Sequence, residues 1–240
     1  TFFLRNLSGG DSFTVEHVMD FAFSESGAFI SYTVSAPEGE GNGIFLRDLS
    51  SGAVIPLHEV ARGHYAHLVW ARDADHLAFT SAMLDEEGEP GDAEIRVWAG
   101  DGEARTVASS EEAPEGYMVP SKNELSWSRD GKRLFFGFKP IDENAVDRDG
   151  EDDDAPFESY DFDALLDRRE VDVWHWNDPR IIPNQKERWE EHEKHRLYRA
   201  VIHLRSGDVV PLADLEVPQV QPSDNPRVAL GDSDVPYLKE

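Results

Sequence analysis

Hydrophobic and polar residues alternate in short runs along this chain, and turns rich in Gly, Asp and Ser separate the runs. A period of two predicts β-strands that bury one face of a sheet. The clearest case is LSWSRDGKRLFF at 125–136, which predicts a strand, a tight turn at 129–131 and the start of a second strand. Gly131 supplies the positive φ that such a turn needs, and Asp130 can hydrogen-bond the turn backbone.

This strand-turn-strand pattern occurs three times. An aromatic residue precedes each turn, at Phe23, Trp70 and Trp127. An aliphatic residue and then an aromatic residue follow each turn, in the pairs Ile30/Tyr32, Leu77/Phe79 and Leu134/Phe136. Such an internal repeat indicates that one structural unit is used several times.

A second hairpin alternates with the first. The segment FLRNLSGG at 3–10 matches FLRDLSSG at 45–52, and AVIHLRSG at 200–207 is a further copy. A shorter version lies at 95–107. Two hairpins per unit make four antiparallel strands, and repeats of this size are typical of a β-propeller. A β-sandwich would not require an aromatic residue to recur in register with the turn, so we predict an all-β propeller.

We expect residues 1–240 to form one partial β-propeller domain of about four blades. The outer hairpin of one blade covers 1–18, whole blades cover 19–62, 64–110 and 121–215, and 226–240 begin another. The incomplete ends could combine into a four-bladed ring, or the chain could be an arc of a larger ring. The start within a strand and the abrupt end favour the arc.

The third whole blade carries an acidic insertion. Residues 142–163 are dominated by Asp and Glu, and like charges in one run resist compaction, so we expect a solvated loop. The segment 171–176 then predicts a strand, and 185–196 predicts a short helix.

The formal net charge is -26, from 49 acidic and 23 basic residues. Such a surface repels phosphates and anionic lipid head groups, so neither nucleic acid nor a membrane is an expected partner. No apolar run is long enough to span a bilayer. The chain has no Cys, which removes disulfides, zinc-thiolate sites and thiol nucleophiles.

We expect no catalytic residue, metal or cofactor in this chain. A serine hydrolase would place its nucleophile in a Gly-x-Ser-x-Gly turn, and no such pentapeptide is present. The acidic run 147–154 places its Gly fourth, whereas a calcium-binding EF-hand loop needs it sixth. His192 and His195 lack a third ligand at metal-binding spacing, so an exposed helical position explains them better.

Two tryptophans and three glutamates are candidates for ligand binding. Trp174 and Trp176 share one face of their strand, where they would pack against a neighbouring blade or, alternatively, form a platform for a ligand such as a sugar. Glu111, Glu112 and Glu115 lie just before the Trp127 strand. If they converge at the mouth of the propeller, they could hold a cationic group such as the amino terminus of a peptide. Ordinary surface charge is the alternative.

The repeated aromatic-Ser-x-Asp-Gly-x-x-Leu-x-Phe signature resembles the propeller of TolB-like proteins and of the prolyl oligopeptidase family. The stretch VDVWHWNDPRIIPNQ at 171–185, with HRLYRAVIHLRSGDVVPLAD at 195–214 and VALGDSDVPYLKE at 228–240, is similar to bacterial dipeptidyl-peptidase-like members of that family. The resemblance covers nearly the whole chain.

The resemblance implies an exported serine peptidase, periplasmic or secreted, whose propeller filters peptides by size. Its catalytic serine would belong to a C-terminal α/β-hydrolase domain outside this chain. In dipeptidyl peptidases a Glu pair ahead of a Trp-Ser-Pro strand holds the free amine of the peptide substrate, and Glu111 and Glu112 match that order. Here the pair lies farther upstream, and Arg129 replaces the proline. The alternative function is a TolB-like module that binds other proteins.

Overall fold

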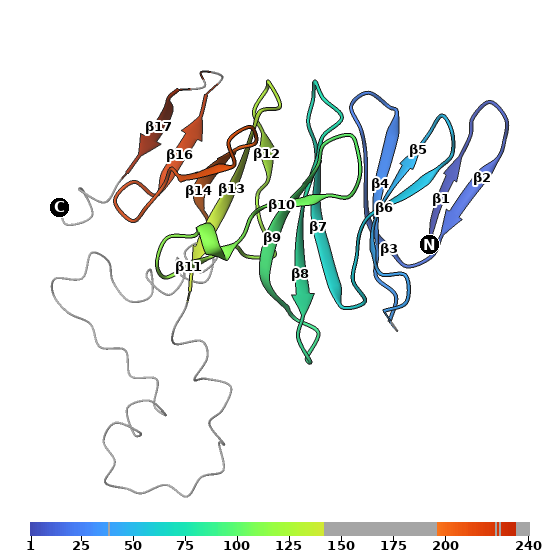
Figure 1. Ribbon diagram of the computed structural model, residues 1–240, viewed down its shortest axis with the longest axis horizontal. Helices are drawn as coiled ribbons and strands as arrows, with labels where there is room; N and C mark the ends of the chain where they lie inside the picture. The colour runs from blue at the N-terminus through green and yellow to red at the C-terminus, as the bar shows by residue number, and fades with distance from the viewer. Residues whose placement is uncertain (38, 142–195, 224, 226, 234–240) are drawn as a thin grey trace, which may run out of the picture. The chain divides into compact units, whose positions relative to one another are not determined.

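The computed structural model describes residues 1–37, 39–141, 196–223, 225 and 227–233 (Figure 1). The chain divides into two compact units. The first, Thr1–Pro140 with Leu197–Asp232, contains every strand described below. The second comprises Ile141–Arg196 and Ser233–Glu240. Most of the predicted acidic loop, strand and helix between 142 and 196 therefore lies outside the described residues.

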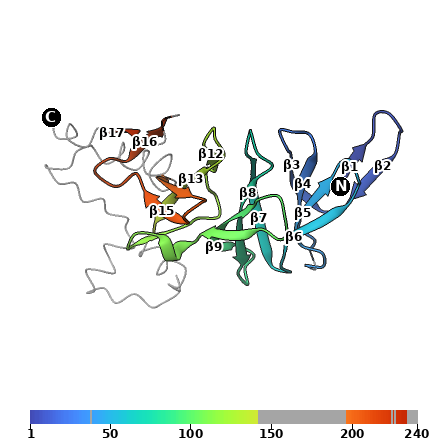
Figure 2. The same cartoon turned by 45° about the horizontal axis from the view of Figure 1, so that its top comes forward.

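Two complete four-stranded antiparallel sheets follow the chain order, as Figure 1 and Figure 2 show. The first sheet contains β3 (Val18–Phe23), β4 (Phe29–Val34), β5 (Gly43–Asp48) and β6 (Val54–Glu59). The second contains β7 (Gly63–Trp70), β8 (Leu77–Leu84), β9 (Pro90–Trp98) and β10 (Arg105–Ala108). Each strand pairs with the next one in the sequence, because short turns join them.

The third sheet has a divided first strand. Both β11 (Tyr117–Met118) and β12 (Ser126–Trp127) pair with β13 (Arg133–Pro140), which is followed by β14 (Tyr198–His203) and β15 (Asp208–Pro211). In the gap between β11 and β12, the Asn123 side chain donates to the Gly137 carbonyl and accepts from the Gly137 N–H, both at 2.8 Å. The amide thus replaces a missing backbone partner. The insertion connects β13 to β14.

Two-stranded hairpins complete the described fold. β1 (Phe2–Arg5) pairs with β2 (Ser12–Val15), and β16 (Gln219–Pro222) pairs with β17 (Ala229–Asp232). A short 3-10 helix, η1 (Ser110–Glu112), precedes β11, and no α-helix occurs among the described residues. The predicted all-β architecture of four-stranded antiparallel units is therefore confirmed. The blade bounds and the single domain over 1–240 stay a prediction.

The hydrophobic core lies between successive sheets. Strands β5, β7 and β8 contribute one cluster, which includes Leu46, Trp70 and Phe79. Strands β9, β13 and β14 contribute another, which includes Ile95 and Phe136. The aliphatic and aromatic residues that follow each repeated turn are at most 3% exposed: Ile30, Tyr32, Leu77, Phe79, Leu134 and Phe136. The repeat therefore supplies the residues that hold neighbouring sheets together.

The strand register reveals a fourth copy of the repeat. The aromatic residue before the turn pairs with the aliphatic residue after it, in the pairs Phe23/Ile30, Trp70/Leu77 and Trp127/Leu134. In the last hairpin, Pro222 and Ala229 occupy the same two positions. A further blade was predicted from residue 226 onward, but the sequence does not indicate this pair, because Pro222 is not aromatic and Ala229 is smaller than the aliphatic residue of the other copies.

Candidate functional site

Tryptophan side chains link the first strands of successive sheets. The indole N–H of Trp127 in β12 donates a 2.9 Å hydrogen bond to the carbonyl of Val69 in β7. The indole N–H of Trp70 in β7 likewise donates to the carbonyl of Ala22 in β3, at 3.3 Å, and to the Ser31 hydroxyl, at 3.1 Å. The repeat thus carries a blade-to-blade hydrogen bond as well as packing.

The turn after Trp127 is stabilised by its own side chains. The Ser128 hydroxyl accepts from the Arg133 N–H at 3.0 Å and donates to Asp130 Oδ1 at 2.6 Å. Asp130 Oδ1 also accepts from the Lys132 N–H, and Gly131 has a φ of 64°. These bonds, led by the one from Ser128, lower the pKa of the Asp130 carboxyl. The roles predicted for Asp130 and Gly131 are confirmed.

The turn of the first sheet uses the same chemistry. The Ser24 hydroxyl accepts from the Phe29 N–H at 3.0 Å, and Gly27 has a φ of 69°. The Ser26 hydroxyl reaches the turn of the second sheet, where it donates to Asp75 Oδ1 at 2.7 Å. The turns of the first and second sheets are therefore tied to each other.

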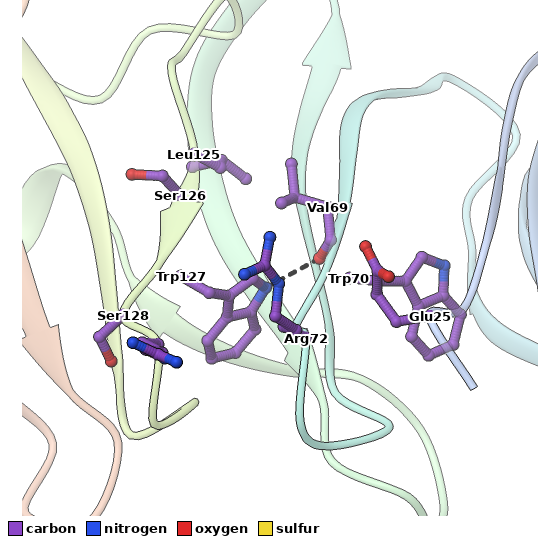
Figure 3. Close-up of a pocket in the computed structure, with 9 residues that line it drawn as sticks. Glu25, Val69, Trp70, Arg72, Leu125, Ser126, Trp127 and Ser128 are labelled. Carbon is purple, nitrogen blue, oxygen red and sulfur yellow. Dashed lines mark hydrogen bonds between the residues drawn. The ribbon is translucent and has the colours of Figure 1, made fainter.

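These turns line an open cavity of about 550 Å3, here called the turn cavity (Figure 3). The third sheet provides most of its wall, through Leu125, Ser126, Trp127, Ser128 and Arg129. The second sheet provides Val69, Trp70 and Arg72, and the first provides Glu25. In Figure 3 the Trp127 indole points toward the strand that carries Val69.

The charged residues of the turn cavity occupy one position of the repeat. Glu25, Arg72 and Arg129 each stand two residues after the aromatic residue of their copy. All three side chains are exposed, yet they line the same cavity. In the sequence, Arg129 is notable only because it replaces the proline of the family pattern, and no motif there marks Glu25 or Arg72. Comparing this offset across the three copies would have indicated the site.

The three predicted substrate-binding glutamates lie elsewhere. Glu111 and Glu112 belong to η1, and Glu115 follows it; all three are exposed. They precede β11, whose Tyr117 pairs with Pro140 at one end of β13, whereas Trp127 pairs with Leu134 toward the other end. At about 3.4 Å per residue, the two pairings lie roughly 20 Å apart along β13. None of the three glutamates lines the turn cavity.

Glu112 has a structural partner. Its Oε2 accepts from the Ser109 N–H at 2.8 Å and from the Ser109 hydroxyl at 2.9 Å, which forms a capping box at the start of η1. The Ser-Ser-Glu-Glu sequence at 109–112 carries the signature of this motif. Glu111 and Glu115 are exposed as well.

The other candidate residues, Trp174, Trp176, His192, His195 and the run 147–154, lie outside the described residues. Within the described part of the chain, no cluster of three or more His, Asp or Glu side chains is arranged to bind a metal. Among these same residues, no helix has the length and hydropathy needed to cross a membrane.

Neither a protein-family model nor a curated protein matches this sequence. Among solved structures, TolB from Acinetobacter baumannii is similar over 89% of this chain and 37% of its own, with 14% identity and a TM-score of 0.43. The β-propeller domain of the Trilobed protease from Pyrococcus furiosus is similar over 92% and 80%, with 14% identity and a TM-score of 0.28.

Prolyl oligopeptidase B from Galerina marginata is similar over 50% of this chain, with 21% identity and a TM-score of 0.36. This chain spans 18% of that protein and about a third of TolB. The chain is a β-propeller module. Its repeated turns, linked from one sheet to the next through Trp70 and Trp127, are the basis of that architecture.

Proposed function

We propose that this propeller module is the non-catalytic portion of a serine peptidase of the prolyl oligopeptidase family. It gates and helps to bind peptide substrates for a C-terminal α/β-hydrolase domain outside these residues. The aromatic-Ser-x-Asp-Gly repeat and the Trp-His-Trp-x-Asp-Pro stretch at 174–179 support the family. The turn cavity is the observation that supports the binding role. Glu25, Arg72 and Arg129 line it just after the ends of β3, β7 and β12, the strands that begin the three sheets.

The gating role follows from where the first strands lie in a propeller. They surround a central channel, which is too narrow for a folded protein but admits an extended peptide. The hydrogen bonds from Trp70 to Ala22 and from Trp127 to Val69 hold the first strands of neighbouring sheets close together. A channel that is held in this way selects by size, because widening it would break these bonds.

The second part of the proposal concerns the amino terminus of the peptide. A carboxylate recognises an ammonium group by a charge-assisted hydrogen bond. Glu111 and Glu115 are exposed at the start of β11, and Glu112 lies between them with its carboxylate in the capping box. We assign the ammonium contact to Glu111 and Glu115, with Glu112 fixing the segment that carries them.

The full-length product of the parent gene provides the test. A fluorophosphonate probe labels an activated serine covalently, and peptide mapping locates the label. We expect the labelled serine downstream of residue 240. A label within residues 1–240 would overturn the proposal. A full-length product without a reactive serine would also overturn it and would favour the TolB-like module that binds other proteins.

The amine contact has its own test in the same full-length protein. Replacing both Glu111 and Glu115 with Gln should raise KM for a peptide substrate with a free amino terminus and leave KM for its N-acetylated form unchanged. Glu103→Gln in the β9–β10 turn is the matched control, because this glutamate is exposed and lies outside the segment. Equal effects on both substrates would contradict the assignment.

A further inference from the structure

We propose that the turn cavity is a carboxylate-binding site that holds an extended peptide through Arg72 and Arg129. These arginines come from the turns after β7 and β12, on two neighbouring sheets, and both line the cavity. The proposal concerns a ligand contact made by this chain alone. It rests on the peptide-binding role proposed above for the same cavity, but it depends neither on the hydrolase domain nor on the glutamates near η1.

The chemistry of the two arginines selects the ligand. A guanidinium is planar, always charged and presents donors in a fork that matches the two oxygens of a carboxylate. Both groups line the same cavity, so each is placed to contact a carboxylate bound there. Two arginines on one cavity are a local concentration of positive charge in a chain with 49 acidic and 23 basic residues.

The negative net charge of the chain makes a polyanion an unfavourable ligand for this cavity. A chain of net charge -26 repels a nucleic acid or a phosphorylated surface over its whole extent. A single carboxylate is attracted by the nearby guanidinium groups, while more distant charges are screened beyond about 8 Å at physiological salt. A peptide with one carboxylate and otherwise neutral or basic residues is the ligand that satisfies both conditions.

The rest of the wall suits the peptide that carries this carboxylate. Trp70, Trp127 and Val69 offer apolar surface for a neighbouring side chain. Glu25 adds an acceptor for a peptide N–H or an ammonium group. The arrangement therefore orients a peptide, with its carboxylate at the arginines and its donors toward Glu25.

The cavity is built on turns that are already ordered. The Ser26 hydroxyl ties the turn that carries Glu25 to Asp75 in the turn that carries Arg72. The Ser128 hydroxyl fixes the turn that carries Arg129 through Arg133 and Asp130. A preorganised site loses little entropy when it binds a ligand, so these contacts favour affinity.

The test is calorimetric titration of the full chain with three short peptides. The probes are acetyl-Ala-Ala-Phe with a free carboxylate, the same peptide as its amide, and the amide of acetyl-Ala-Asp-Phe. We expect binding of a probe with a carboxylate and none of the fully amidated neutral peptide. The first probe reports on a terminal carboxylate and the third on an acidic side chain, so the pair identifies the source.

Charge-neutral variants assign the contact to its residues. Arg72→Gln and Arg129→Gln should each weaken binding of the carboxylate probe by about tenfold or more, as for loss of a charged hydrogen-bond partner. Glu25→Gln should strengthen it, since a like charge is removed. Arg105→Gln is the matched control, because this exposed arginine lies on β10 outside the cavity.

Two outcomes would overturn the proposal. One is the absence of binding by either carboxylate probe at millimolar concentration. The other is binding that both arginine variants and the control leave equally strong. Thermal unfolding of each variant shows that it is folded, so a loss of binding is a loss of the contact. Failure here leaves the serine-labelling result of the full-length protein unaffected, so the two proposals are tested separately.

Discussion

The indole N–H of Trp127 lies 2.9 Å from the carbonyl oxygen of Val69, the residue that directly precedes Trp70 in the neighbouring sheet. Trp70 makes the same contact one repeat earlier, with the carbonyl of Ala22, which directly precedes Phe23. In both cases an indole N–H donates to the backbone carbonyl of the preceding sheet, one residue before the aromatic position of the repeat. This contact supplements the packing of one sheet on the next.

We expect Trp127→Phe to lower the free energy of unfolding by about 1 kcal/mol, because it removes the donor of the hydrogen bond to the Val69 carbonyl. Urea unfolding followed by circular dichroism measures the effect. Phe23→Leu is the matched control at the same repeat position, where the ring has no N–H and is 50% exposed. An equal loss in both variants would show that packing alone, and not the hydrogen bond, stabilises the contact.

Gly131→Ala should destabilise the fold by about 1 kcal/mol, since a φ of 64° is unfavourable for any residue with a Cβ. Space is not the reason, because the added atom would lie 3.7 Å from Ala74 Cβ and 3.8 Å from Ala71 Cβ. Gly91→Ala in β9 provides the comparison, as this glycine has no positive φ and is exposed. If the unfolding midpoint falls equally in Gly131→Ala and Gly91→Ala, the positive φ of Gly131 is not the cause of the destabilisation.

Three histidines make stability depend on pH. Burial lowers the pKa of His58, His64 and His67 below the ordinary 6.5. The unfolded chain then binds more protons than the folded chain below pH 6.5, so the stability present above pH 6.5 is lost as the pH falls from 6.5 through the lower pKa values of the folded state.

The measurable consequence is a difference between wild type and His64→Gln. Urea midpoints at pH 5, 6 and 7.5 in 0.5 M NaCl should rise with pH less steeply in the variant than in the wild type. The comparison removes the general effect of net charge, which both proteins share. If the urea midpoint of His64→Gln rises with pH as steeply as that of the wild type, or more steeply, His64 does not contribute to the pH dependence of stability.

Glu112→Ala should lower the free energy of unfolding by about 1 kcal/mol, as expected for loss of a capping box. Its carboxylate accepts both the N–H and the hydroxyl of Ser109. Glu111→Ala is the adjacent control and should change stability by less than about 0.5 kcal/mol, in the range of ordinary surface substitutions. Larger destabilisation by Glu111→Ala would reverse the roles assigned to these residues.

Some features of this protein were predictable because they depend on adjacent residues. Alternation with a period of two identified the strands, and Asp130-Gly131 identified the turn whose φ and hydrogen bonds the structure shows. The recurrence of Phe23, Trp70 and Trp127 identified repeated sheets. Turn preferences and strand periodicity depend on residues only a few positions apart. The sequence alone therefore predicts these turns and strands.

Other features depended on which sheets become neighbours. Pro222 and Ala229 pair at the same positions as the three repeated pairs, and only the strand register shows this, because this hairpin has no aromatic residue before its turn. The shared cavity of Glu25, Arg72 and Arg129 arises because turns far apart in the sequence meet at one edge of adjacent sheets. Local propensities carry no information on such distances, so tertiary packing alone brings these charges together.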